Sequence, residues 1–563
     1  MPHIHVQLRA TCLSLVAVFS AELPTLAQPV APEAFETFEE WCLYRANIDQ
    51  AARDTVNALL RAVGTTDCTE ANERLMAPEQ VTLDLRLNPY VLYLRQQQEA
   101  QATNSTPQFS AVPLLPPLLP PLPLLSYPTP FNSSGRPMTA YFRDGQTEIT
   151  DLRPLEPLTN LRALYLDNNR IADLSPLRSL THLTTLELNS SNIVDIAPLA
   201  ELTQLTSLSL KDNRIQDLTP LSSLTALTQL HLSGNDVTSL SPLTPLTNLQ
   251  VLSLEGCKVT DLAPIATLTQ LQHLRLRGNA VTDVSPLASL TQLTTLGLER
   301  NQITDVTPLG ALTQLTNLSL NNNQIVDPAP LRSLTSLTFL NLGENRITRV
   351  NGLESLTALT GLGLANNQVT DIAPLRSLTQ LETLRLNHNQ ITDVTPLRSL
   401  TQLQTLSLNR NRITNVSHLQ PLVNLNELQL GENQIADLNP LRSLTRLEVL
   451  ALNNNRISSI TTLRSLSNLG FLDLRNNRVR DVAPLRSLRR LYYVRLAGNP
   501  VSNLNSIQRR GLATDLGTDS GLPPLPTFIV PLPPIPSYRL PPVPILRPIP
   551  QASPPSLPPG ETE

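Results

Sequence analysis

The stretch Thr181–Leu188, THLTTLEL, returns as Thr203–Leu210, TQLTSLSL, with an offset of 22 residues. The same frame, L-x-L-x-x-N-x-I/V, recurs 16 times without insertion or deletion. Repetition with a fixed period of this length indicates a solenoid, in which each unit buries its apolar side chains only against its neighbours.

The sixth position of the frame is almost always the polar residue Asn. It is Asn in 14 of the 16 units, Ser191 in one and Cys257 in another. A buried Asn amide both donates to and accepts from backbone groups, so stacked Asn side chains are expected to form a ladder along the solenoid. The ladder residues are Asn169, Asn213, Asn235, Asn279, Asn301, Asn323, Asn345, Asn367, Asn389, Asn411, Asn433, Asn455, Asn477 and Asn499.

Each half of the unit predicts a different local structure. In L-x-L both Leu side chains point to one face, which predicts a short strand in a parallel sheet. The second half reads Asp-x-x-Pro-Leu-x-x-Leu, with Pro at 12 of the 16 equivalent places. Pro suits the first turn of a helical segment, and Asp173 and its counterparts suit turns or caps. We expect 3₁₀ or irregular turns there because the segment is short.

These motifs resemble the 22-residue leucine-rich repeats of the internalin family and of the phosphatase-1 regulatory subunit. The resemblance covers roughly 370 of the 563 residues. It implies an α/β solenoid: a leucine-rich-repeat horseshoe with a parallel concave β-sheet, a 3₁₀ or irregular convex side and a small helical N-terminal cap. We assign the repeat domain, 16 repeats of 22, to residues 139–514.

Residues 28–95 precede the array and resemble the helical caps of internalin-type proteins. Apolar residues recur at helical spacing within 33–76, and Gly64 suits a helix C-terminus. Cys42 and Cys68 would staple this cap in an oxidising compartment. Two free buried thiols are the alternative. Cys257 is expected to remain free.

The remaining segments have other signatures. Residues 1–27 read as a signal peptide that ends at Thr25-Leu26-Ala27, with a cytosolic, buried apolar start as the alternative. Residues 96–138 are a Pro-rich linker, and 515–563 are expected to form a Pro-rich disordered tail. We find no transmembrane segment in the mature chain, because prolines interrupt its Leu-rich run.

Composition and motifs argue against several functions. The chain has 42 basic and 46 acidic residues, a net charge of −4, which argues against a nucleic-acid partner. No phosphate-binding loop, metalloprotease, nucleophile-elbow or paired Cys–His motif is present. We therefore expect no enzyme activity, no catalytic residue, no metal and no cofactor.

The outward positions of the strands vary from unit to unit, unlike the Leu frame. Variation of this kind favours a binding face, although drift at exposed positions also explains it. Three groups are candidate contacts with a partner, and a solvated surface is the alternative for each. They are His273, Arg275 and Arg277; the aromatic Phe339 beside small residues; and Phe471, Asp473, Arg475, Tyr493 and Arg495.

The sequence therefore predicts an exported, internalin-like scaffold that binds a protein partner through its concave face. We expect a monomer that is secreted or held in the periplasm or cell envelope of a bacterium. Two alternatives remain: an intracellular scaffold similar to the phosphatase regulator, and an envelope structural or spacer protein.

Overall fold

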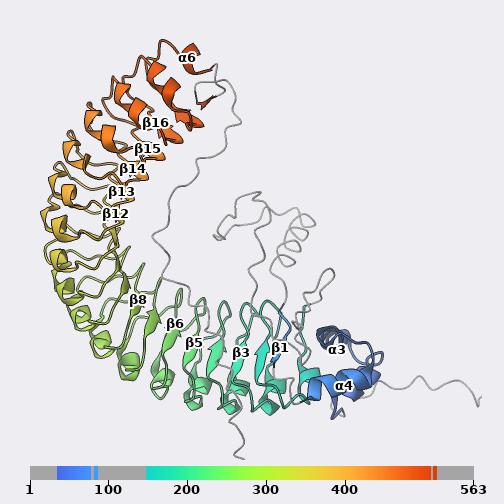
Figure 1. Cartoon of the computed structure of the whole chain (residues 1–563). Helices are drawn as coiled ribbons and strands as arrows, with labels where there is room; N and C mark the ends of the chain where they lie inside the picture. Colours follow the sequence, from blue (N-terminus) through green and yellow to red (C-terminus); the bar gives the residue numbers. More distant parts are fainter. Residues whose placement is uncertain (1–34, 78–81, 87–147, 509–511, 516–563) are drawn as a thin grey trace, which may run out of the picture.

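A computed structural model describes residues 35–77, 82–86, 148–508 and 512–515. The signal peptide, the Pro-rich linker and the Pro-rich tail expected from the sequence lie outside these described residues. Within them the chain forms an open arc, with strands along the inner face and short helical turns along the outer face (Figure 1). The solenoid fold expected from the repeat is confirmed.

The described residues contain an 18-stranded parallel sheet in which each strand pairs with the next along the chain. Its strands are β1 (Thr82–Asp84), β2 (Ala163–Tyr165), β3 (Thr185–Glu187), β4 (Ser207–Ser209), β5 (Gln229–His231), β6 (Val251–Ser253), β7 (His273–Arg275), β8 (Thr295–Gly297), β9 (Asn317–Ser319), β10 (Phe339–Asn341), β11 (Gly361–Gly363), β12 (Thr383–Arg385), β13 (Thr405–Ser407), β14 (Glu427–Gln429), β15 (Val449–Ala451), β16 (Phe471–Asp473), β17 (Tyr493–Arg495) and β18 (Ala513–Thr514).

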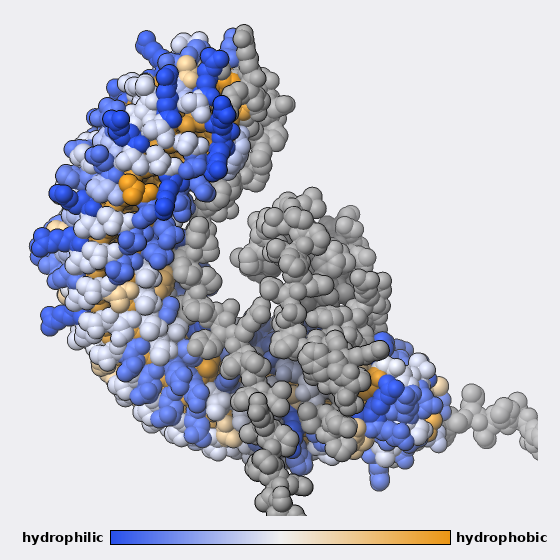
Figure 2. Space-filling model, viewed as in Figure 1, coloured by the Kyte–Doolittle hydropathy of each residue, from blue (hydrophilic) through white to orange (hydrophobic). Residues whose placement is uncertain are grey.

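The outer side is built of 3₁₀ turns, one before the first repeat and one in each repeat except the last, and its surface is mostly hydrophilic (Figure 2). They are η2 (Arg153–Leu155), η3 (Ser175–Ser179), η4 (Ala197–Glu201), η5 (Thr219–Ser223), η6 (Ser241–Leu243), η7 (Ala263–Thr267), η8 (Ser285–Ser289), η9 (Thr307–Ala311), η10 (Ala329–Ser333), η11 (Leu353–Ser355), η12 (Ala373–Ser377), η13 (Thr395–Ser399), η14 (Ser417–Leu419), η15 (Asn439–Ser443), η16 (Thr461–Ser465) and η17 (Ala483–Ser487).

The repeated Asp and Pro residues explain why these turns form. Pro176 stands in the first turn of η3, where its missing N–H costs no helical hydrogen bond. Asp173 accepts a hydrogen bond from the backbone N–H of Ser175 at 2.8 Å, and this bond lowers the pKa of Asp173. The Asp side chains are therefore turn residues, as expected from the sequence.

The core is a stack of Leu rows between the sheet and the turns. Leu296 of β8 lies in register with Leu274 of β7 and Leu318 of β9, and all three are fully buried. Burying one such side chain contributes about 1.5–3 kcal/mol, but only if a neighbouring repeat covers it. The array is therefore stable as a whole and needs a covered end.

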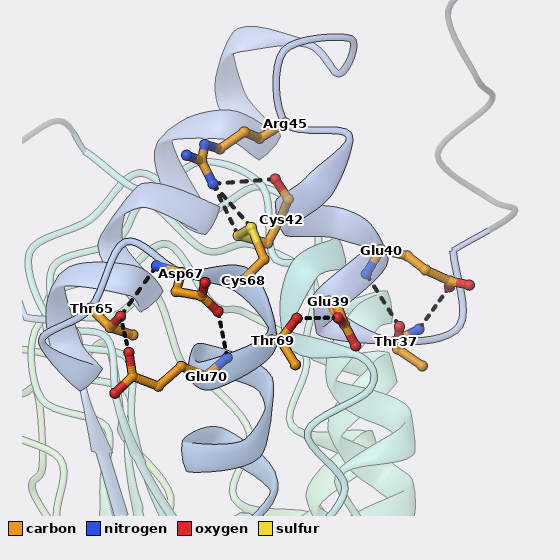
Figure 3. The surroundings of a disulfide bond; sticks show 10 residues. All are labelled: Thr37, Glu39, Glu40, Cys42, Arg45, Thr65, Asp67, Cys68, Thr69 and Glu70. Atoms are coloured by element: carbon orange, nitrogen blue, oxygen red, sulfur yellow. Dashed lines mark hydrogen bonds between the residues drawn. A yellow bond between two sulfur atoms is a disulfide. The ribbon is translucent and has the colours of Figure 1, made fainter.

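A helical cap covers the N-terminal end of the array (Figure 1). It consists of α2 (Phe38–Leu43), α3 (Gln50–Val63), which ends at the left-handed Gly64, and α4 (Cys68–Met76). At the other end of the array lies α6 (Asn505–Gln508). A disulfide joins Cys42 to Cys68 and so links α2 to α4 (Figure 3).

Polar contacts fasten the cap to the first repeat. The guanidinium of Arg153 in η2 pairs with Asp49, the N-cap residue of α3, at 2.6 Å and lies 5.7 Å from the Trp41 ring. The hydroxyl of Thr55 donates to the backbone oxygen of Asp151. These contacts hold α3 over the end of the Leu core.

Candidate functional site

The concave face is lined by the side chains that alternate with the core Leu residues. In β7, Leu274 points into the core while His273 and Arg275 lie on the opposite face, because successive side chains of a strand alternate. Parallel pairing in register then places the equivalent residues of neighbouring repeats side by side along this face.

A hollow of about 700 Å³ lies on this face beside β5, β6, β7 and β8. Its volume is within the range of roughly 300–1,000 Å³ that is typical of ligand sites. The hollow exists because small residues flank a long side chain: Arg275 lies between Ser253 of β6 and Gly297 of β8. Its charged lining residues are Lys211, Asp212, Glu255, Arg275, Arg277 and Arg300.

Cations dominate the charge of this hollow. Four of the six charged lining residues are basic. Among the residues that the structure describes, no acid lies within ion-pair distance of Lys211, Arg277 or Arg300. Cations that converge on a concave surface raise the local concentration of anions.

Two histidines in the hollow are neutral at pH 7. Burial, together with the charges of Lys211 and Arg275, lowers the pKa of His231 to about 4. Burial and the charge of Arg275 also lower the pKa of His273. The positive charge of the hollow therefore comes from the Lys and Arg side chains.

Two acids lie beside the cations without an ion pair to them. Glu255 and Glu299 occupy, one repeat to either side, the position that Arg277 holds. Burial raises the pKa of Glu299, the charge of Glu255 raises it further, and Arg277 opposes the shift. The hollow is therefore a mixed surface with an excess of positive charge.

One rim of the hollow has no side chains over three consecutive repeats. Gly234, Gly256 and Gly278 occupy a left-handed backbone position that directly precedes the ladder residue. Twelve other repeats hold a residue with a side chain at this position, among them Asp212 and Arg300, which border the three glycines. We call Gly234, Gly256 and Gly278 the glycine gap.

Of the sequence-predicted groups, His273, Arg275 and Arg277 lie at the hollow. Sequence reasoning missed Lys211 and the glycine gap. The signal for the gap was available: three successive units have Gly where, apart from Gly498 in the last unit, the others have a side chain. Lys211 occupies the same repeat position as Arg277, three repeats earlier, and both line the hollow.

Three residues of the C-terminal candidate group, Phe471, Asp473 and Tyr493, are buried in the structure. Phe471 and Tyr493 do lie side by side, with ring centroids 5.8 Å apart. However, Phe471 is 4% exposed, Tyr493 9% and Asp473 4%, so these side chains are buried and do not stand open to a partner. That this group contacts a partner stays a prediction.

The charged residues at this end make contacts within their own repeats. Asp473 and Arg495 are in register, but the carboxylate of Asp473 pairs with Arg475, at 2.6 Å. Arg495 lies over the Tyr493 ring of its own strand, 5.6 Å from its centroid.

Phe339 likewise packs into the sheet surface. It lies between Asn317 and Gly361 in register and is 6% exposed. Its ring is therefore buried in the sheet surface, although the residues beside it are small. Its position, two strands beyond β8, is outside the lining of the hollow.

The described residues contain no group of three or more His, Cys, Asp or Glu side chains that could hold a metal ion. None of the described helices is long and apolar enough to cross a membrane.

Comparison with known proteins agrees with this architecture. A family model for leucine-rich repeats, two copies per match, matches overlapping segments from residue 159 to residue 465. No curated protein sequence matches the chain.

Solved structures give the same result. The internalin InlF of Listeria monocytogenes is 35% identical, covers 54% of this chain and 90% of its own, and has a TM-score of 0.51. A leucine-rich-repeat protein of Leptospira interrogans is 29% identical, with 65% and 92% coverage and a TM-score of 0.58. A plant peptide hormone receptor, RGFR1, shares the fold at 21% identity, with 61% and 64% coverage and a TM-score of 0.50. The chain therefore belongs to the leucine-rich-repeat family, as an internalin-like scaffold of the kind that is typical of protein–protein interaction.

Proposed function

We propose that the protein is an exported scaffold that binds a protein partner through its concave face, at the hollow beside β5–β8. The observation that carries the proposal is this hollow of about 700 Å³, where Lys211, Arg277 and Arg300 have no acidic partner among the described residues. A structural spacer has no need of a hollow lined by unneutralised cations.

Export is supported by the disulfide between Cys42 and Cys68, since such bonds persist in oxidising compartments. Binding of a protein is supported by the scaffold class, and the structure of the similarly folded RGFR1 is a complex with RGF2. The export proposal predicts a secreted form that begins near Gln28. An intact Met1 form in the cytosol would contradict it.

Site-directed photo-crosslinking tests the concave face. One variant carries the crosslinking residue at Glu255, which lines the hollow, and its matched control carries it at Ala266 in η7 of the same repeat. The proposal expects one protein to be captured from Glu255 and not from Ala266, and the same protein to bind again when purified. Equal capture at both positions, or capture at Ala266 alone, would refute concave-face binding.

A further inference from the structure

Packing does not require Gly at two of the three positions of the glycine gap. A Cβ atom on Gly234 would press against Asp212, but Gly256 and Gly278 have room. A Cβ atom built on Gly256 meets no heavy atom within 4 Å, and one on Gly278 meets only backbone atoms of Gly256, the nearer at 3.7 Å. Asn322 and Asn366 adopt the same left-handed backbone at the equivalent position of other repeats. Asn therefore fits at Gly256 and Gly278 both sterically and in its backbone angles.

The gap opens the rim of the concave face next to the cationic hollow. Gly234, Gly256 and Gly278 all line the hollow, and Arg300 follows them at the same repeat position. Absent side chains let another backbone approach closely, which is a common role of Gly near ligands. An extended chain can thus cross the rim here without meeting a side chain.

The basic side chains around this crossing favour a ligand that carries carboxylates. Arg277 and Arg300 are exposed, and Lys211 is half-buried. Guanidinium groups bind carboxylates through two parallel hydrogen bonds, which suits acidic side chains of a peptide. Glu255 and Asp212 interrupt the cations, so a polymer with dense, uninterrupted negative charge would meet repulsion.

We propose that the hollow binds an extended acidic peptide segment, which crosses the rim at the glycine gap and places its carboxylates against Arg277, Arg300 and Lys211. This inference rests on the proposed function and names the chemistry of the partner's docking segment.

The inference is tested with a labelled peptide of alternating Glu and Gly, and its Gln–Gly counterpart as the uncharged probe. We expect the Glu peptide to bind the full chain, to weaken with added salt, and to bind far more tightly than the Gln peptide. The double variant Arg277→Glu/Arg300→Glu is expected to lose at least about thirtyfold in affinity. Its charge-matched control is Arg332→Glu/Arg376→Glu, exposed in η10 and η12 on the convex side, which should bind like the wild type.

The glycine gap is tested separately from charge. Gly256→Asn/Gly278→Asn should lose about tenfold in affinity, because the new side chains fill the crossing. Asn carries some strain in the left-handed backbone, but Asn322 and Asn366 adopt it in the native chain, so the variant should still fold. His388→Asn places the same side chain at the equivalent position of a repeat outside the hollow, and the affinity for the Glu peptide should not change. Wild-type affinity in the glycine variant would refute the crossing.

The remaining outcomes are distinct. No binding of the Glu peptide, or equal binding by the Arg277→Glu/Arg300→Glu variant, overturns the acidic-peptide inference. Saturable binding of a sulfated oligosaccharide without binding of the peptide also overturns it in favour of a polyanion.

If the Glu255 crosslinker still captures its partner in the charge-reversed variant, concave-face binding stands while the acidic class fails. If the peptide binds but no partner is captured, the proposed function fails alone.

Discussion

The side-chain oxygen of Asn323 accepts a hydrogen bond from the backbone N–H of Ile303 in the preceding repeat, at 3.0 Å. The amide nitrogen of the same Asn323 donates to the backbone oxygens of Leu298, at 2.9 Å, and Leu320, at 3.0 Å. One side chain thus satisfies backbone groups of two adjacent repeats inside the fold.

The first prediction concerns this side chain. Asn323→Ala leaves the buried N–H of Ile303 without its acceptor and takes one donor each from the backbone oxygens of Leu298 and Leu320. Those two oxygens keep the amides of Asn301 and Asn345, so the free energy of unfolding should fall by about 1–3 kcal/mol, mainly from the N–H. Gln324→Ala, one residue further and outside the ladder, should cost under about 0.5 kcal/mol. Urea unfolding followed by several probes measures both, because repeat arrays need not unfold in two states. Equal losses would show that the amide contributes nothing specific.

The second prediction concerns Cys257, which occupies a ladder position. Its sulfur lies 3.4 Å from the backbone oxygen of Leu232, a weaker contact than an Asn amide makes there. Cys257→Asn supplies both a donor and an oxygen acceptor and should raise the free energy of unfolding by about 0.5–1.5 kcal/mol. Cys257→Ala, which supplies neither, is the control. A loss of stability in the Asn variant would mean that the site cannot accommodate the amide.

Most of the fold could be predicted from the sequence, because each repeat has the same turn residues and the same spacing of Leu. Asp173 and Pro176 define the turn, and the Leu spacing defines the strand. The site followed less well. The burial of Phe471 and Tyr493 depends on what packs over each ring in the folded chain, including the other ring, and the repeat period does not encode these contacts.

The third prediction concerns the cap. Replacing both Cys42 and Cys68 by Ser opens a link between positions 26 residues apart and should destabilise the protein by about 3–4 kcal/mol. The loss should be concentrated in the cap, where hydrogen exchange of α2 and α4 reports it directly. Mass mapping of non-reduced peptides should find Cys257 free, as the structure has it. A peptide that links Cys257 to either cap cysteine would contradict the ladder placement.

The fourth prediction concerns acid sensitivity. The folded-state pKa of His231, about 4, is below the ordinary value of 6.5, so the unfolded chain binds the proton more tightly. The contribution of neutral His231 to the free energy of unfolding is therefore complete above about pH 6.5 and is lost as the pH falls towards 4. The total loss is at most about 3 kcal/mol. His231→Gln should flatten that part of the stability profile. The exposed His182→Gln should leave it unchanged, and a profile identical to the wild type in both variants would count against a buried neutral His231.

The fifth prediction has the opposite sign and concerns Glu187 of β3. Burial, followed by the charge of Asp167, raises the pKa of Glu187 to about 7, although Arg86 lies 3.7 Å away and opposes the shift. The folded chain therefore binds this proton more tightly than the unfolded chain, whose carboxyl has its ordinary pKa of 4.5. Stability from the protonated group is present below about pH 4.5 and is lost as the pH rises towards 7.

Glu187→Gln keeps a neutral hydrogen-bonding side chain in place at every pH. We expect it to raise the free energy of unfolding at pH 8 by on the order of 1–3 kcal/mol and to have little effect at pH 4. Glu201→Gln is the control, because Glu201 is exposed on the convex side, where its pair with Arg178 is solvated. Urea unfolding of both variants at the two pH values decides the matter. If Glu187→Gln destabilises the protein at pH 8, then the ionised carboxylate is held favourably by Arg86, and the raised pKa must be abandoned.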